Sequence, residues 1–162
     1  MLKPPDSHYL RAAEGWLELG DCGEAFAELA RISSRFALAP ETLEMRCRIC
    51  TSAKDWEGLA QASAQLIAMQ PGEVEWHIRH ANALFFMGRA AQAREFVLPL
   101  IGKFPDNAIL QYNLACYECQ LGSFDSSKSW LTKSISLNKR LRDYARLDPD
   151  LAPFWQHFPE FH

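Results

Sequence analysis

Residues 108–124 read AILQYNLACYECQLGSF, and residues 74–90 read VEWHIRHANALFFMGRA. The two stretches align without a gap when the chain is shifted by 34 residues. In both, a small residue stands at the eighth position, Ala115 in one and Ala81 in the other. A match at a fixed shift indicates an internal repeat, and a repeat of this length is typical of stacked helical units.

The same shift brings four frames of the chain into register. One column is always small: Ala13, Cys47, Ala81, Ala115. A second column is small in three frames of four: Ala25, Leu59, Ala93, Ser127. A third column holds glycine in three frames of four: Gly20, Lys54, Gly88, Gly122. Glycine takes positive φ without steric cost and so ends helices. Each frame is therefore predicted to contain two helices joined by a tight turn.

Periodicity within the frames supports this prediction. Tyr9, Ala13 and Trp16 lie on one helical face, and Leu29 and Ile32 lie on one face of a second segment. The predicted helices lie near 6–19, 22–35, 40–53, 56–69, 74–87, 90–103, 108–121 and 124–137. One pair cannot cover its apolar faces alone, whereas four stacked pairs can.

Helix-terminal signals refine these bounds. Pro40 suits the first turn of the third helix, and Asp106 is expected to cap the seventh, with Asn107 in a tolerant connecting turn. Pro99 falls inside the sixth helix, where it should break or kink it.

The domain organisation follows from the frames. The expected segments are a lead of 1–5, four repeats at 6–39, 40–73, 74–107 and 108–138, and a capping helix with an aromatic tail at 139–162. The capping helix is expected over about 139–147, and Asp148-Pro149-Asp150 then breaks it before an apolar segment, 151–161. Terminal repeats need a polar outer cover, which charged residues of the cap can supply: Lys139, Arg140, Arg142, Asp143, Arg146.

The pattern resembles the tetratricopeptide repeat (TPR) family, whose 34-residue unit carries W-x₂-L-G-x₂-Y, A-x₃-F and Pro. The best matches are Gly88-x₄-Ala93-x₃-Val97 with Pro105, and Tyr112-Asn113-Leu114-Ala115. The resemblance covers 6–139 and implies an all-α solenoid of four antiparallel helix pairs. Departures include Lys54 for glycine and Glu118 at an apolar position. The 35-residue RNA-reading cousins share the periodicity, but the charge disfavours them.

Composition limits the function classes. The chain of 162 residues is 48% apolar and 23% charged, as in ordinary globular proteins. A net charge of −3 disfavours nucleic-acid binding. No apolar run has the length of a membrane span, and no apolar core follows Lys3 as in a signal peptide. With five cysteines, an odd number, the chain is expected in the reducing cytoplasm.

Neither a metal site nor catalysis is expected. Cys47/Cys50 and Cys116/Cys119 form two C-x₂-C pairs, but they lie two repeats apart and fill core columns. His77 and His80 could share a metal, yet both fall in packing columns. The sequence has no nucleophile elbow, phosphate-binding loop or H-E-x-x-H motif, so we expect no enzyme and no cofactor.

The resemblance implies that the first helix of each unit lines a groove for a peptide or helix of another protein. Carried over by frame, the groove residues are Leu10, Glu14, Leu17, Glu44, Arg48, Ile78, Asn82, Phe85, Tyr112, Asn113 and Cys116. The amides of Asn82 and Asn113 could each pair with a peptide backbone. For Phe85 and Tyr112, packing against neighbouring side chains is the alternative.

The residues also bear on three other functions. Chaperone-tail-binding members of the family hold a C-terminal carboxylate with five Lys, Asn and Arg residues, but of the matching positions here only Arg79 agrees. A client chaperone of the secretion type, or a self-associating structural protein, remain as alternatives to a binding module. Self-association would use the tail, as a homodimer through Phe154, Trp155, Phe158 and Phe161.

Overall fold

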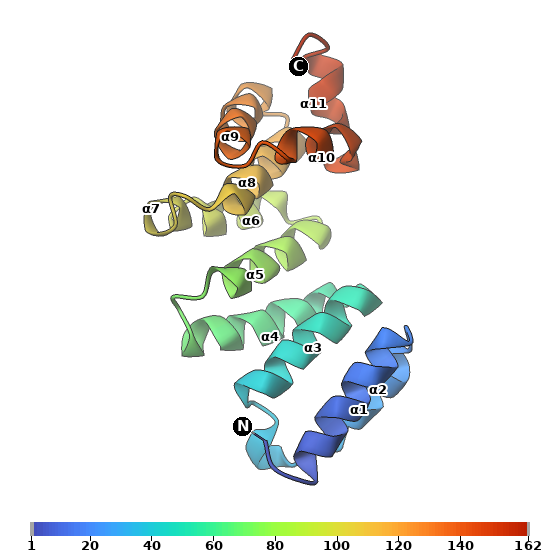
Figure 1. The fold of residues 1–162 in the computed structure, drawn as a ribbon. Helices are drawn as coiled ribbons and strands as arrows, with labels where there is room; N and C mark the ends of the chain where they lie inside the picture. Colours follow the sequence, from blue (N-terminus) through green and yellow to red (C-terminus); the bar gives the residue numbers. More distant parts are fainter. Residues whose placement is uncertain (1, 162) are drawn as a thin grey trace. The chain divides into compact units, whose positions relative to one another are not determined.

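The computed structural model describes residues 2–161, which form helices and no β-strand (Figure 1). The α-helices are α1 (Asp6–Glu18), α2 (Cys22–Ala30), α3 (Pro40–Ala53), α4 (Trp56–Met69), α5 (Val74–Phe86), α6 (Ala90–Val97), α7 (Leu100–Lys103), α8 (Ala108–Gln120), α9 (Phe124–Leu137), α10 (Leu141–Leu147) and α11 (Ala152–His157). Two 3₁₀ helices are η1 (Ser34–Phe36) and η2 (Pro149–Leu151). The chain divides into two compact units, one ending at Ala83 and one beginning at Leu84, within α5.

In the first unit, α1 pairs with α2 and α3 pairs with α4. The predicted small residues Ala13 and Ala25 are completely buried, which lets the two backbones approach closely. Gly20 ends the first helix at φ +81°, and the Asp21 side chain accepts a hydrogen bond of 3.0 Å from the Glu24 amide to start the next. The predicted helix–turn–helix is confirmed here, except that the second helix ends earlier than predicted.

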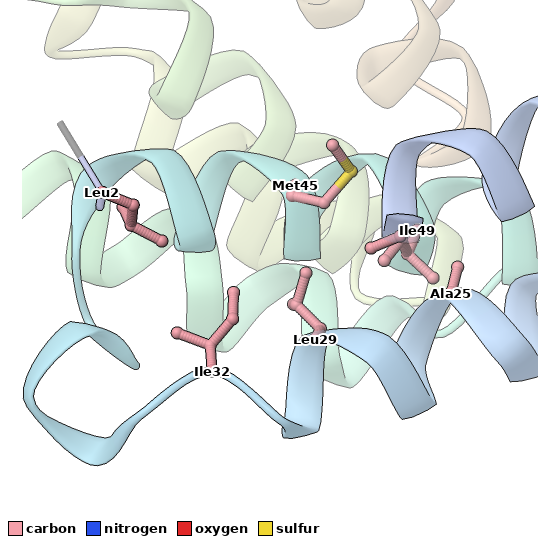
Figure 2. Close-up of a cluster of buried hydrophobic side chains, with 7 residues drawn as sticks. Leu2, Ala25, Leu29, Ile32, Met45 and Ile49 are labelled. Atoms are coloured by element: carbon pink, nitrogen blue, oxygen red, sulfur yellow. The ribbon is translucent and has the colours of Figure 1, made fainter. Parts of the chain in front are cut away.

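The core of this unit begins between α2 and α3. Figure 2 shows Ala25 and Leu29 of α2 directed at Met45 and Ile49 of α3, with Ile32 and Leu2 beside them. A second cluster, which includes Leu43, Leu59 and Leu66, joins α3 to α4 and to Ala83 of α5. Each large aliphatic side chain buried in this way stabilises the fold by roughly 1.5–3 kcal/mol.

Lys54 ends α3 in the left-handed conformation that the other frames give to glycine. Its φ of 56° is the one positive value at a non-glycine residue in the described chain, and a side chain in this region costs about 1–2 kcal/mol. The turn is still made, because the Lys54 and Asp55 amides bond the carbonyls of Thr51 and Cys50. The left-handed conformation is therefore adopted at this position of the repeat even without glycine, and glycine lowers its energetic cost.

In the second unit, α8 pairs with α9. Ala115 of α8 and Ser127 of α9 are completely buried, and the Ser127 hydroxyl donates to the Ala115 carbonyl at 2.7 Å. Serine thus keeps the close approach of the two helices because its polar atom has a partner. Leu110, Leu114 and Leu131 complete this part of the core.

Glu118 of α8 is the charged residue at an apolar position, and the structure explains it. Its side chain is 4% exposed and accepts a 2.6 Å hydrogen bond from the Arg94 guanidinium of α6. A buried carboxylate is tolerated when it is paired in this way. The ion pair ties α6 to α8 within the second unit.

Two of the predicted helices are shorter in the structure. The helix predicted over 22–35 ends at Ala30, because Asp6 takes hydrogen bonds from the Ser33 amide (2.7 Å) and hydroxyl (3.0 Å) and turns the chain into η1. The helix predicted over 90–103 is divided into α6 and α7 around Pro99. That break was expected, since proline lacks the amide that an uninterrupted helix needs.

The cap of α8 also differs from the prediction. Asn107, and not Asp106, is the N-cap, and its side chain accepts a 2.9 Å hydrogen bond from the Leu110 amide. Asn107 is therefore not a tolerant turn position, because loss of a cap typically costs about 1 kcal/mol. The capping helix begins at Leu141 rather than at 139, because Asn138 is extended and its side chain bonds the Arg140 amide.

The C-terminal segment packs on the second unit. Leu141 and Ala145 of α10 are buried, whereas the charged side chains predicted as a polar cover are all exposed. Phe154 of α11 is fully buried, and the Trp155 indole donates to the Ala145 carbonyl at 2.9 Å. These two rings of the tail therefore pack on their own chain.

The outer part of the tail is also covered by its own chain. The Lys128 ammonium of α9 lies 4.4 Å from the ring centre of Phe158 and 5.3 Å from that of Phe161. The Phe154 ring contacts the Phe158 ring at 5.2 Å and the Phe161 ring at 5.3 Å. Much of the apolar surface that self-association through this tail would need is used within the chain.

Overpacking tests the register. We expect Ala81→Leu to lower the free energy of unfolding by about 1–3 kcal/mol, because Ala81 is completely buried. Ala68→Leu makes the same change on the exposed face of α4 and should alter stability by less than about 0.5 kcal/mol. Urea denaturation followed by circular dichroism measures both. Equal midpoints would show that the small column does not mark helix packing.

Removal of one partner tests the buried ion pair. Arg94→Met should destabilise the protein by roughly 1–3 kcal/mol, since it leaves the buried Glu118 carboxylate without its hydrogen-bond donor. The matched control is Arg79→Met, which breaks the Arg79–Glu75 pair along α5, whose Glu75 side chain is 54% exposed. That change should cost at most about 1 kcal/mol. The same chemical denaturation series decides the outcome, and an equal loss in both variants would contradict the role given to Glu118.

Candidate functional site

The predicted groove residues of the first two repeats meet in the first unit. Leu10, Glu14 and Leu17 come from α1, and Glu44 and Arg48 come from α3. The Arg48 guanidinium donates to the Glu14 carboxylate at 2.7 Å. These two residues stand 34 positions apart, so equivalent faces of the two first helices adjoin.

The groove side chains on α1 have a double role. Leu10 and Leu17 are half-buried and pack against the cluster that contains Met45 and Ile49. Part of each side chain belongs to the core, and the remainder lies at the surface. The Arg48 and Glu14 side chains are 42% and 45% exposed, and such surface ion pairs contribute only about 0–1 kcal/mol. A partner could therefore replace this pair at little cost.

The groove residues of the third repeat are divided between the units. Ile78 and Asn82 of α5 are half-buried in the first unit. Phe85 belongs to the second unit, where its ring packs 4.9 Å from Tyr117 and 5.6 Å from Phe86. The packing alternative for Phe85 thus has direct geometric support.

The groove residues of the fourth repeat are largely covered by the chain itself. Tyr112 and Cys116 are buried, and Asn113 is half-buried. The Tyr112 hydroxyl donates to the Asp148 carboxylate at 2.5 Å, and its ring lies 5.6 Å from that of Tyr144. The Asp148 turn therefore occupies the surface on which Tyr112 and Cys116 were expected to meet a partner.

Sequence reasoning treated Asp148-Pro149-Asp150 only as a helix breaker and missed this contact. Spacing was the available signal, because Asp148 follows Tyr112 by 36 residues, about one repeat. A residue one repeat later is the spatial neighbour of its equivalent, as Glu14 and Arg48 show. Extension of the 34-residue frame to a fifth repeat would have placed this turn beside α8.

The four paired cysteines are core residues. Cys47 and Cys50 are buried in the first unit, and Cys116 and Cys119 in the second. Burial raises the pKa of Cys47 to about 11 and, together with the Asp55 carboxylate, the pKa of Cys50 to about 12. Burial also raises the pKa of Cys116 and of Cys119. These thiols stay protonated at neutral pH and are poor nucleophiles and ligands.

The two histidines tie backbone segments together in the first unit. His77 Nε2 lies 3.2 Å from the Pro71 carbonyl, and His80 Nδ1 lies 3.1 Å from the Ala60 carbonyl. Burial lowers the pKa of His80, which favours the neutral ring. Among residues 2–161, no cluster of three or more His, Cys, Asp or Glu side chains is arranged to hold a metal ion.

The comparisons with known proteins identify the fold. No protein-family model and no curated protein matches this chain. Among solved structures, residues 41 to the end of MamA from Desulfovibrio magneticus RS-1 match with a TM-score of 0.75 and 14% identity, over 90% of this chain and 82% of that one. A double mutant of MamA RS-1 matches with a TM-score of 0.76 and 14% identity, over 98% and 93% of the two chains.

This chain has the TPR fold. It is an all-α solenoid of antiparallel helix pairs, the architecture of the MamA structures. At 14% identity the likeness shows the fold alone. Within residues 2–161, every helix is too short or too polar to cross a membrane.

Thiol accessibility tests the assignment of the cysteines. Cys22 is half-buried and should react first with a thiol reagent at pH 7, while the other four react slowly because they are buried and protonated. Protein purified without chelator should contain no stoichiometric zinc, and a chelator should leave the helical circular dichroism unchanged. In denaturant, as a control, all five thiols should react with the reagent at the same rate. One zinc per chain would contradict the assignment.

Proposed function

We propose that this protein is a non-catalytic interaction module that holds a peptide or helix of another protein against the groove face of α1 and α3. The Glu14–Arg48 ion pair carries the proposal, because it supports one continuous surface over equivalent positions of two repeats. An extended segment binds well to such a face when apolar anchors and exchangeable charges alternate along it. Leu10 and Leu17 supply the anchors.

The chemistry of the partner follows from these side chains. Glu14 and Arg48 each present one charge, and Glu44 adds a second carboxylate on α3. We therefore expect a segment with apolar residues at helical or extended spacing and with both signs of charge. The proposal places the protein in the cytoplasm, since all five cysteines are free. It includes neither catalysis nor a cofactor.

Two alternatives predict different behaviour. A client chaperone would bind many unfolded chains with little dependence on Glu14 or Arg48. A structural protein would self-associate, and light scattering coupled to size-exclusion chromatography would then give more than one chain per particle. Because Phe154 is buried within its own chain, its ring offers no surface to a homodimer or a larger assembly.

Variants of the ion pair test the proposal. Proteins that bind the wild-type chain are identified, and their affinity is then measured for Glu14→Ala and Arg48→Ala. Because both side chains are exposed, stability should change by less than about 1 kcal/mol. Affinity should fall by about tenfold or more where either residue is a hot spot.

The controls lie on α4. Gln61→Ala and Gln65→Ala change exposed side chains of a second helix and should leave affinity unchanged. Tyr112→Ala is unsuitable as a groove variant, because it would also remove a buried contact to Asp148. If the α4 variants lose binding while Glu14→Ala and Arg48→Ala keep it, the face of α1 and α3 is not the binding surface.

A further inference from the structure

A cleft of about 600 Å³ lies in the second unit, apart from the groove residues of α1 and α3. Its lining includes Phe86 from the end of α5, Leu121 after α8, and Asp150 in η2. Phe86 is 50% exposed and Leu121 is 41% exposed. The volume lies within the range of clefts that hold small ligands or a few peptide side chains.

Asp150 is held in place by its neighbours. Its backbone carbonyl accepts a 2.7 Å hydrogen bond from the Gln120 side chain of α8. Its amide donates to the Asp148 carboxylate at 2.9 Å, and Asp148 is itself bound to the Tyr112 hydroxyl. The Asp148-Pro149-Asp150 turn is thus anchored to α8 at both acidic residues, which fixes the backbone from which the Asp150 side chain reaches the cleft.

Asp150 is the acidic side chain in the lining of this cleft, and Arg89 is the basic one, but the two form no ion pair within 4.0 Å in the part of the chain that the structure describes. In the described chain Asp150 forms neither an ion pair nor a hydrogen bond through its own oxygens. Partial burial and the nearby Asp148 carboxylate both raise the pKa of Asp150, so its charged form is disfavoured by its surroundings. Asp148 differs, because Tyr112 and the Asp150 amide satisfy its oxygens. A cation in the cleft would relieve the unfavourable environment of Asp150.

The first turn of α6 adds hydrogen-bond donors to the same cleft. Ala90, Ala91 and Gln92 line it, and the first amides of a helix have no acceptor within that helix. Arg89 precedes the helix without capping it through its side chain. A peptide could therefore place backbone carbonyls at these amides while its side chains face the apolar and acidic parts of the lining.

We propose that this cleft binds a basic side chain, lysine or arginine, of a partner peptide, with the cation at Asp150 and flanking apolar residues on Phe86 and Leu121. The proposal rests on the proposed function, since it assumes that the chain recognises peptides. It adds a second contact of defined chemistry on a different unit. The aromatic part of the lining suits the occupant, because the stem of a lysine or arginine is apolar and its cation is attracted to ring faces.

The test uses two terminally blocked peptides that differ at one position. One carries lysine between two leucines, and the other carries norleucine there, which keeps the stem and removes the charge. Calorimetry measures both peptides against the wild-type chain and against Asp150→Asn. The wild-type chain should prefer the lysine peptide by about tenfold, the usual value of a charge-assisted contact. Asp150→Asn should reduce that preference to near unity.

Two further variants separate the effect of the Asp150 charge from a general change of charge and from a loss of apolar contact. Glu95→Gln removes one exposed negative charge from α6 outside the cleft and should keep the preference for lysine. Phe86→Ala should weaken both peptides alike, because it removes apolar contact and no charge. Asp150→Asn should fold as stably as the wild-type chain, since no partner of its carboxylate is lost.

Three results would overturn the proposal: an unchanged preference in Asp150→Asn, tighter binding of a glutamate peptide through Arg89, or no binding of either peptide at millimolar concentration. None of these results would affect the groove of α1 and α3, which lies in the other unit and is tested by Glu14→Ala and Arg48→Ala. Conversely, loss of the lysine preference in Asp150→Asn supports the cleft even if those two variants bind their partner normally.

Discussion

Close approach of two antiparallel helices is the constraint on which this structure depends. The interface of α1 and α2 contains Ala13 and Ala25, and that of α8 and α9 contains Ala115 and Ser127, all fully buried. A larger side chain at these points would separate the backbones and expose the leucines behind them. The turns, caps and polar substitutions of the chain are arranged so that this approach is kept.

The constraint acts on side-chain volume more strongly than on polarity. Ser127 satisfies it because its hydroxyl bonds the Ala115 carbonyl across the interface. Cys47 occupies the same column as Ala13 and remains a buried thiol. Glu118 shows the limit, because a full charge is accommodated only with the Arg94 guanidinium beside it.

Periodicity and turn residues were sufficient to predict the all-α fold, the start of α3 at Pro40 and the turn at Gly20. These features depend on interactions within a few residues of sequence. The early end of α2 depends on Asp6, which reaches Ser33 across 27 positions, and no column of the repeat reports such a contact. The candidate site was predictable to the same extent. Glu14 and Arg48 adjoin because the repeat requires it, whereas burial of Tyr112 depends on Asp148, which lies beyond the last predicted repeat.

The Asp148-Pro149-Asp150 turn also determines where the array ends. An array of stacked helix pairs has an apolar face at each end, much as a β-sheet has edge strands. Another helix pair could pack on either of these faces. Here α10 starts where a fifth first helix would start, but Pro149 interrupts it and η2 and α11 return over α8 and α9. The last face is thereby closed with the chain's own leucine and aromatic side chains. Lengthening this protein by duplication of a repeat at its C-terminal end would first require loss of that turn.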